Sequence, residues 1–347
     1  FKVDQFYSNI KGTPEGLLFD FGNTGLNGTL YYGFVPLNDS KYPHPVFFGE
    51  AESIRGGKAS ASLRKTADKH DMIGWRTENQ GIVGYRVVNQ GGFILYDGKI
   101  NFNSEDFNNT YQQYNEGPYG QKIPIKTESF RVATAIIEGP ILANPAPSSM
   151  TIYLRTSAKT PVTFQVKKKR FRSKNDTRHE IMLEGLEPDT EYEYKVLYGT
   201  FEETYTFRTP PLPGTRKPFT FAYASDSRGG SGGGERSLYG TNAYIMKKIM
   251  ALSLQQNARF VQFTGDMVNG YSTDPEEIRL QYFNWKRSID PFARHIPVIA
   301  TMGNHEAVVK SFQKQGSNQV VRIDNFPYDE VSAEAIFAQE FVNPLNG

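Results

Sequence analysis

The chain has 347 residues, of which 38% are hydrophobic and 22% charged, and its formal net charge is +2. A charge so close to zero gives no general attraction to nucleic acid or to an anionic membrane surface, so a nucleic-acid partner is not expected. The absence of cysteine excludes disulfides, zinc–thiolate sites and cysteine nucleophiles. No apolar stretch reaches the roughly 18 residues that a membrane-spanning helix needs.

Residues 1–125 have the pattern of short strands separated by glycine and asparagine. The clearest runs are TLYYGFVPL and GIVGYRVVNQGGFILYDGKINF, and the NQGG inside the second run predicts a hairpin. Only NSEDFNNTYQQY favours a helix of more than a turn or two. We therefore predict a β-rich accessory domain of unknown type, without a catalytic group.

Residues 126–210 contain strand-like runs separated by turn residues, at the spacing of a β-sandwich. In LEGLEPDTEYEYKV, Tyr192 follows a turn at Pro188, as in the tyrosine corner of sandwich domains. On these residues and on SMTIYLRTS, the segment resembles a fibronectin type III domain, in the variant that precedes the catalytic domain of purple acid phosphatases. The basic run KKKRFRSK predicts a solvated hairpin, with a patch for anionic partners as the alternative.

Beyond the proline-rich linker TPPLPGTRKP, strands and helices alternate. FTFAYAS predicts a buried strand, and TNAYIMKKIMALSLQQ an amphipathic helix with Thr241 as its N-cap. ARFVQFTGD predicts a second strand, the next helix begins at Asp274 and Pro275, and IPVIATMGNHE predicts a third strand. This order indicates a parallel sheet with right-handed crossovers, whose strand C-termini lie along one edge.

Polar side chains follow all three predicted strands. They are Asp226, then Asp266 forty residues later, then Asn304 and His305 after a further 38 residues. Carboxylate, amide and imidazole groups are ligands that suit Mn, Fe or Zn. Two carboxylates and an amide oxygen on adjacent loops are typical of a two-metal site for phosphate-ester hydrolysis.

The runs SDSR, FTGDMVNG and MGNHE resemble the D-x-H, GD and GNH-[DE] motifs of calcineurin-like metallophosphoesterases, in the same order and strand context. The resemblance covers residues 217–306. It implies that Asp226 binds the first metal ion, that Asp266 bridges both ions and that Asn304 binds the second. It also implies that His305 contacts the phosphate or protonates the leaving group. The implied reaction is attack of a metal-activated hydroxide on a phosphomonoester or phosphodiester.

The domain order of the resembled family implies two Fe, Mn or Zn ions and a phosphorylated small molecule or other phosphoester as substrate. It also implies an exported protein, whether secreted, periplasmic or at the cell surface, with protein partners at the envelope. The predicted fold class is multidomain β plus α/β. It consists of the β-rich region, the fibronectin type III-like sandwich and a metallophosphoesterase α/β sandwich over residues 217–347.

Two residues depart from the family pattern. Arg228 stands where the family has His, or Gly in purple acid phosphatases, and a guanidinium has no lone pair for a metal ion. We expect Arg228 to clamp two phosphate oxygens, with a surface ion pair as the alternative. Asn269 stands where purple acid phosphatases have a metal-binding tyrosine, so no tyrosinate–iron centre is expected, although Tyr271 lies nearby.

The family's later G-H-x-H motif has no counterpart, because no histidine follows His305. The second metal ion would then have only Asp266 and Asn304, so we expect residues 217–347 to be the N-terminal part of a longer domain. Two functions remain open: a metal-dependent phosphoesterase, and an exported binding or complex subunit with a degenerate metal site. Arg228 and the missing histidines favour the second. The first is favoured by the retained residues Asp266, Asn304, His305 and Glu306.

Overall fold

The computed structural model describes residues 1–35, 47–69, 73–104, 114–116, 122–124, 130–229, 237–313, 316, 318, 320–324 and 331–344. The chain forms two compact units, Asp4–Ile137 and Glu138–Gly347, the second together with Phe1–Val3. In the part of the chain that is described, no helix is long and apolar enough to cross a membrane.

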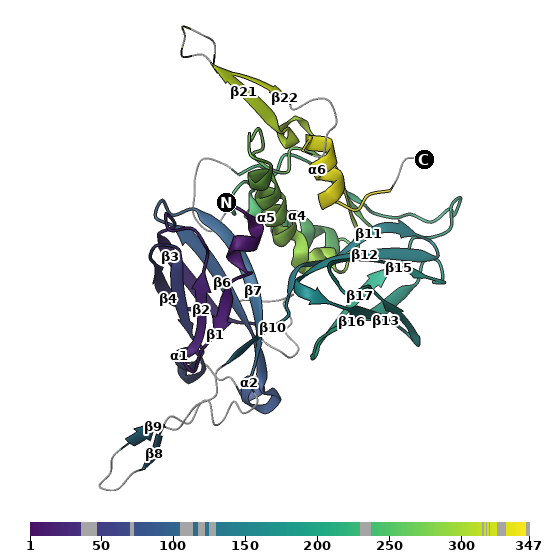
Figure 1. Cartoon of the computed structure of the whole chain (residues 1–347). Helices are drawn as coiled ribbons and strands as arrows, with labels where there is room; N and C mark the ends of the chain where they lie inside the picture. The colour runs from purple at the N-terminus through teal and green to yellow at the C-terminus, as the bar shows by residue number, and fades with distance from the viewer. Residues whose placement is uncertain are drawn as a thin grey trace. The chain divides into compact units, whose positions relative to one another are not determined.

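The N-terminal unit is rich in antiparallel strands, as the sequence predicts (Figure 1). Its elements are η1 (Val3–Phe6), β1 (Ile10–Gly12), β2 (Gly16–Asp20), β3 (Gly28–Val35), β4 (Phe47–Ile54), β5 (Lys58–Ser62), α1 (Leu63–Lys69), α2 (Ile73–Glu78), β6 (Gln80–Asn89), β7 (Ile94–Asn103), β8 (Tyr114–Glu116), β9 (Lys122–Pro124) and β10 (Arg131–Ala133). The described strands of this unit form three sheets, with strand orders β10-β7-β6-β3-β4, β1-β2-β5 and β8-β9.

Aromatic rings fill the core of this unit. Phe6 stacks on Tyr96 with ring centroids 4.8 Å apart, and Trp75 meets the edge of Phe102 at 5.0 Å. A Cβ atom at Gly81 would lie 2.6 Å from the Phe102 ring, so glycine makes room for the ring between neighbouring strands. The aromatic-rich composition of the first 125 residues therefore serves packing.

The predicted NQGG hairpin is confirmed, because β6 and β7 are antiparallel neighbours and the amide of Asn89 donates to the carbonyl of Phe93 (3.0 Å). The described α-helices of this unit, α1 and α2, have seven and six residues, so each spans about two turns or fewer. Most of NSEDFNNTYQQY, the predicted helix candidate, lies outside the described residues.

Seven strands form two sheets in the next part of the chain. They are β11 (Ile136–Ala146), β12 (Ser149–Thr160), β13 (Val162–Val166), β14 (Lys169–Arg172), β15 (Asp176–Glu184), β16 (Glu191–Tyr198) and β17 (Phe201–Arg208). The sheet orders are β11-β12-β15 and β14-β13-β16-β17, so the basic run forms a hairpin whose second strand is an edge strand. The Tyr192 hydroxyl accepts a hydrogen bond from the Glu187 amide (2.8 Å), which is the bond of a tyrosine corner.

The remaining elements alternate strand and helix around a parallel sheet. They are β18 (Ala222–Ala224), α4 (Ala243–Gln255), β19 (Val261–Thr264), α5 (Pro275–Ala293), β20 (Val298–Thr301), η3 (Asn304–Glu306), β21 (Val309–Gln313), β22 (Val320–Asp324) and α6 (Ala333–Glu340). β18, β19 and β20 are parallel in that order, as predicted, and β21 and β22 form a hairpin that projects away from α6 (Figure 1).

Two local predictions in this segment are wrong. The N-cap of α4 is Asn242, whose side chain accepts from the Ile245 amide (3.2 Å), because the Thr241 hydroxyl bonds to backbone carbonyls below the site. The first strand is not buried: β18 has three residues and Tyr223 is 70% exposed. Among the described residues, β18 is the edge strand of its sheet, so no described strand pairs with one side of it. The α5 N-cap, Asp274, is as predicted.

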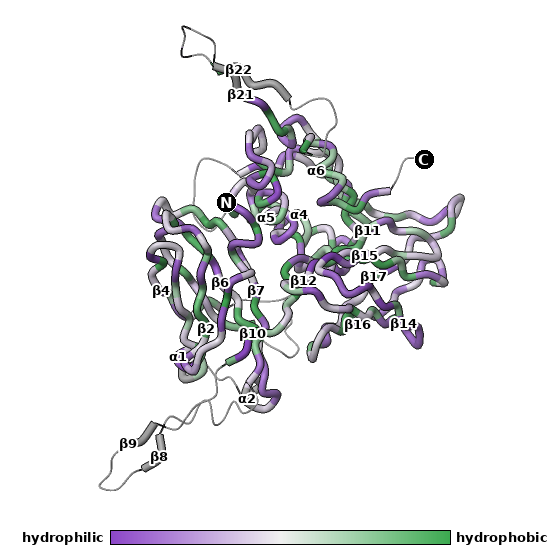
Figure 2. The backbone as a smooth tube through the Cα atoms, viewed as in Figure 1, coloured by the Kyte–Doolittle hydropathy of each residue, from purple (hydrophilic) through white to green (hydrophobic). Residues whose placement is uncertain are grey.

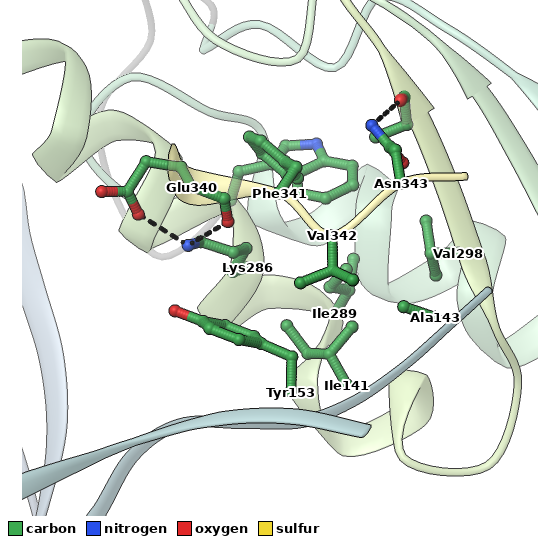
Figure 3. A pocket seen from close by; sticks show the side chains of 12 residues that line it. Ile141, Ala143, Tyr153, Lys286, Ile289, Val298, Glu340, Phe341, Val342 and Asn343 are labelled. Carbon is green, nitrogen blue, oxygen red and sulfur yellow. Dashed lines mark hydrogen bonds and ion pairs between the residues drawn. The ribbon is translucent and has the colours of Figure 1, made fainter. Parts of the chain in front are cut away.

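Helix α5 packs against the sandwich, and one hydrophobic core cluster contains Ile141 of β11 and Tyr153 of β12 together with residues of α4, α5, β19 and β20. Figure 2 colours the backbone of these elements by hydropathy. The Lys286 ammonium lies 2.6 Å from Glu138 of β11 and 2.9 Å from Glu340 of α6, and all three side chains are at most 4% exposed. Figure 3 shows Lys286 and Glu340 beside a cavity of about 20 Å³, which has room for one water molecule. Burial alone would raise the pKa of Glu340, but Lys286 and Arg155 lower it to about 2.

Candidate active site

The predicted site residues lie on the loops that follow β18, β19 and β20, at the carboxyl edge of the parallel sheet. Asp226 and Asp266 both have backbone angles in the left-handed region, with φ of 61° and 54°. Few residues other than glycine adopt this conformation, and it recurs at functional sites where the surrounding structure holds it in place. The Asp226 amide donates to the Gly265 carbonyl (3.1 Å), which fixes the first loop against the second.

Glycines allow the second and third loops to touch along their backbones. A Cβ atom at Gly265 would lie 2.2 Å from the Gly303 nitrogen, and one at Gly270 would lie 1.4 Å from the His305 carbonyl oxygen. Both positions also have positive φ, which glycine adopts without strain. The glycines of FTGDMVNG and MGNHE therefore set how closely Asp266 approaches the loop that carries Asn304.

The buried carboxylate of Glu306 holds the same two loops together. Its oxygens accept from the backbone amides of Gly303 (2.6 Å), Asp266 (2.8 Å), Met267 (2.8 Å) and Val268 (3.3 Å). Burial raises the pKa of Glu306, and the four amide donors oppose that rise. Glu306 therefore supports the loop that contains Asp266 and does not face the open side of the site.

Ser227 anchors the first loop from below. Its side chain is buried, its hydroxyl donates to the Met267 carbonyl (3.1 Å), and it accepts from the indole nitrogen of Trp285 on α5 (2.9 Å). The Thr241 hydroxyl lies 3.0 Å from the Ser227 carbonyl and 3.1 Å from the Met267 carbonyl. These bonds fix the backbone on either side of Ser227, so the side chains of Asp226 and Arg228 start from a rigid base.

The guanidinium of Arg228 points into the site between the two aspartates. Its Nη2 lies 3.6 Å from Asp226 Oδ1, and its Nε lies 3.8 Å from Asp266 Oδ2. Its Nη1 lies 2.5 Å from Nε2 of His305. The structure thus brings Arg228 together with residues from all three loops.

His305 is oriented by the backbone of the second loop. Its Nδ1 lies 2.7 Å from the Asn269 carbonyl oxygen, which can only accept, so Nδ1 carries the proton and Nε2 the lone pair. The ring of Tyr271 packs against the imidazole with centroids 4.6 Å apart. The Tyr271 hydroxyl accepts from Nδ2 of Asn304 (2.5 Å), so the amide oxygen of Asn304 is left for another ligand.

Part of the chain matches the model of a known family. Residues 236–345 match the family model of the calcineurin-like phosphoesterases. The match supports the predicted metallophosphoesterase superfamily, and it covers the loops of Asp266 and Asn304 but begins after Arg228.

Among solved structures, the chain is similar to one described as "Structure of PhoD", with a TM-score of 0.40 and 17% identity. That likeness covers 56% of this chain and 42% of the PhoD chain. A second structure, the "Central Fibronectin-III array of RIM-binding protein", has a TM-score of 0.25 and 13% identity, and the likeness covers 63% of this chain and 74% of that one. The likeness to purple acid phosphatases stays a prediction.

The match to calcineurin-like phosphoesterases implies that divalent metal ions bind at the site. The oxygen atoms of the site residues suit one such ion better than two. Carboxylate oxygens of Asp266 and the amide oxygen of Asn304 suit a hard divalent cation. Between Asp226 and Asp266, a metal ion would lie beside the Arg228 guanidinium, which cannot bind it. Within the described residues, no three His, Cys, Asp or Glu side chains are grouped as metal ligands.

Sequence reasoning missed the supporting residues of the site. Ser227 carries no motif signal of its own, and its link to Trp285 joins residues 58 positions apart. Glu306 was visible as the last residue of MGNHE, but its four amide partners depend on the folded loops. Tyr271 was noted only as a neighbour of Asn269, whereas it contacts both Asn304 and His305.

Proposed function

We propose that this chain hydrolyses phosphate esters at the edge where β18, β19 and β20 end. One observation carries the proposal. The Asp266 carboxylate and the His305 imidazole, from two separate loops, both lie within 4 Å of the Arg228 guanidinium on a third loop. The match of residues 236–345 to calcineurin-like phosphoesterases supports the same reaction class. The substrate is a phosphomonoester or phosphodiester.

The side chains of the site have complementary tasks in this reaction. The planar fork of Arg228 suits two oxygens of a phosphoryl group, and its charge offsets the negative charge that develops as the ester bond breaks. Nε2 of His305 accepts from Arg228 Nη1, so its lone pair can take a proton from attacking water once the guanidinium turns onto the phosphoryl oxygens; the leaving oxygen then takes a proton from solvent. A divalent metal ion held by Asp266 and Asn304 would polarise a phosphoryl oxygen as a Lewis acid.

Hydrolysis of p-nitrophenyl phosphate and bis(p-nitrophenyl) phosphate, each with added Mn²⁺, Zn²⁺ or Fe²⁺, tests the proposal. Asp266→Asn keeps the shape of the side chain but removes its charge, and it is expected to lower kcat/KM by about 100-fold or more. The matched control is Asp274→Asn, because asparagine caps a helix as well as aspartate does. No hydrolysis by the wild type with any of the metals, or full activity in Asp266→Asn, would contradict the proposal.

The clamp role of Arg228 has its own test. Arg228→Ala is expected to raise KM for p-nitrophenyl phosphate without lowering the metal content, because the guanidinium cannot be a metal ligand. A loss of bound metal in this variant would show that Arg228 supports the metal ligands and does not bind substrate.

One observation favours a second function, an exported binding or complex subunit without catalysis. Arg228 already neutralises part of the charge that Asp226 and Asp266 would offer to metal ions. Binding of inorganic phosphate without any hydrolysis would support this alternative. The exported location and the choice among Fe, Mn and Zn belong to the proposal, and cell fractionation and metal analysis of the purified protein test them.

A further inference from the structure

The position between Asp226 and Asp266 holds a positive charge that belongs to the chain itself. Among the described residues, Arg228 is the only lysine or arginine whose nitrogens lie within 4 Å of either carboxylate. Arg228 follows Asp226 by two residues in the same loop. The counter-ion of the two carboxylates is therefore tethered, whereas a metal ion can exchange with solvent.

The loop beneath Arg228 keeps this charge in place. Ser227 is buried and bonds to both the Met267 carbonyl and the Trp285 indole nitrogen, and the Asn242 amide donates to the Ser227 carbonyl (2.7 Å). Because the backbone is held on both sides, only the side-chain torsions of Arg228 can move its guanidinium. A divalent cation placed between the aspartates would be repelled by the positive charge of the Arg228 guanidinium.

The guanidinium also keeps donors for an oxyanion. Its distances of 3.6 Å and 3.8 Å to the aspartate oxygens are longer than hydrogen bonds, so these contacts are charge interactions. Among the described residues, only Nη1 has a hydrogen-bond partner, His305. The Arg228 side chain is 41% exposed, so a phosphoryl group can reach the guanidinium from solvent and accept from N–H groups that have no hydrogen-bond partner among the described residues.

We propose that Arg228 takes the place of one of the two metal ions of a dinuclear site. The chain then holds one divalent cation through Asp266 and Asn304, and Arg228 binds phosphoryl oxygens at the other position. The identity of the substrate rests on the proposed function, but the number of bound metal ions can be measured without it.

The test uses the full chain, stripped with a chelator and titrated with Mn²⁺. The wild type is expected to bind one ion per chain, and its electron paramagnetic resonance spectrum should show no magnetic coupling between ions. Arg228→His replaces the cation with a side chain that has a lone pair, so it should bind one more Mn²⁺ per chain than the wild type, coupled to any ion already bound. Arg228→Lys keeps the charge and should match the wild type.

Two results would overturn the inference. One is a wild type that binds no Mn²⁺ or binds two coupled Mn²⁺ ions per chain, which decides the question even where a variant fails to fold. The other is an Arg228→His variant with the circular dichroism spectrum of the wild type and no additional ion. Failure of the proposed function gives a different pattern, in which the ion counts are as expected but p-nitrophenyl phosphate is not hydrolysed.

Discussion

Replacing Lys286 with methionine should destabilise the C-terminal unit by about 3 kcal/mol. The substitution preserves the length of the aliphatic chain but leaves Glu138, which is fully buried, with Arg155 at 3.8 Å as its one ion-pair partner among the described residues. Glu340 loses less stabilisation than Glu138, because the Arg279 guanidinium remains 2.9 Å from its carboxylate. Removing one partner of a buried ion pair costs about 3–5 kcal/mol, and the remaining arginine puts this case at the lower end.

Urea unfolding followed by tryptophan fluorescence measures this loss. The chain has two tryptophans, so a Trp75→Phe background leaves Trp285, the neighbour of Lys286, as the reporter of the C-terminal unit. With a slope of about 1–3 kcal/mol per molar urea, the midpoint should fall by about 1 M or more. The control is Lys248→Met on the exposed side of α4, which should change the free energy of unfolding by less than about 0.5 kcal/mol.

A double variant separates the buried charge from lost packing. Adding Glu138→Gln to Lys286→Met removes the unpaired carboxylate, so most of the lost stability should return. The reasoning is refuted if Lys286→Met is as stable as Lys248→Met, or if the double variant is no more stable than the single one.

Three further predictions follow from single side chains. Glu306→Gln places an amide NH2 group against backbone N–H donors, so the free energy of unfolding should fall by about 2 kcal/mol or more and the urea midpoint should fall with it. An unchanged midpoint would contradict this prediction. Gly270→Ala should cost about 2–4 kcal/mol, because its Cβ would strike the His305 carbonyl, whereas Gly199→Ala, with a similar φ and no atom within 4 Å, should cost about 1 kcal/mol. Burial lowers the pKa of His179, so the neutral imidazole contributes stability above about pH 6.5, and this contribution is lost as the pH falls through the lowered pKa. The melting temperature of His179→Gln should therefore decline less than that of the wild type as the pH falls through this range. Equal declines in the two proteins would refute the prediction.

Much of the α/β segment could be predicted because its signals are local. Asp274, Pro275 and the acidic first turn mark the start of α5, and the strand–helix order gives a parallel sheet. The same order brings Asp226, Asp266 and Asn304 to one edge. The exposure of β18 could not be predicted, because an apolar run has the same pattern whether its strand is central or at an edge.

The supporting contacts of the site depend on long-range packing that no local pattern encodes. Thr241 has the composition of an N-cap, but its hydroxyl bonds to Ser227 and Met267, and the neighbouring Asn242 caps α4 instead. Competition between two such residues is decided by what lies across the loop. Arg228 could be recognised as a departure from its motif, whereas its position between two carboxylates required the folded loops.

Helix α5 joins two parts of the chain that the linker TPPLPGTRKP separates in sequence. One side of the helix binds the sandwich through Lys286, Asp290 and the carbonyl of Arg294, and Trp285 binds Ser227 in the site loop. Homologous chains should therefore show paired changes at positions on opposite sides of the linker. In a chimaera that exchanged the sandwich for one from a distant relative, Lys286 and Asp290 would face charges that do not match them, beneath the loop of the candidate site.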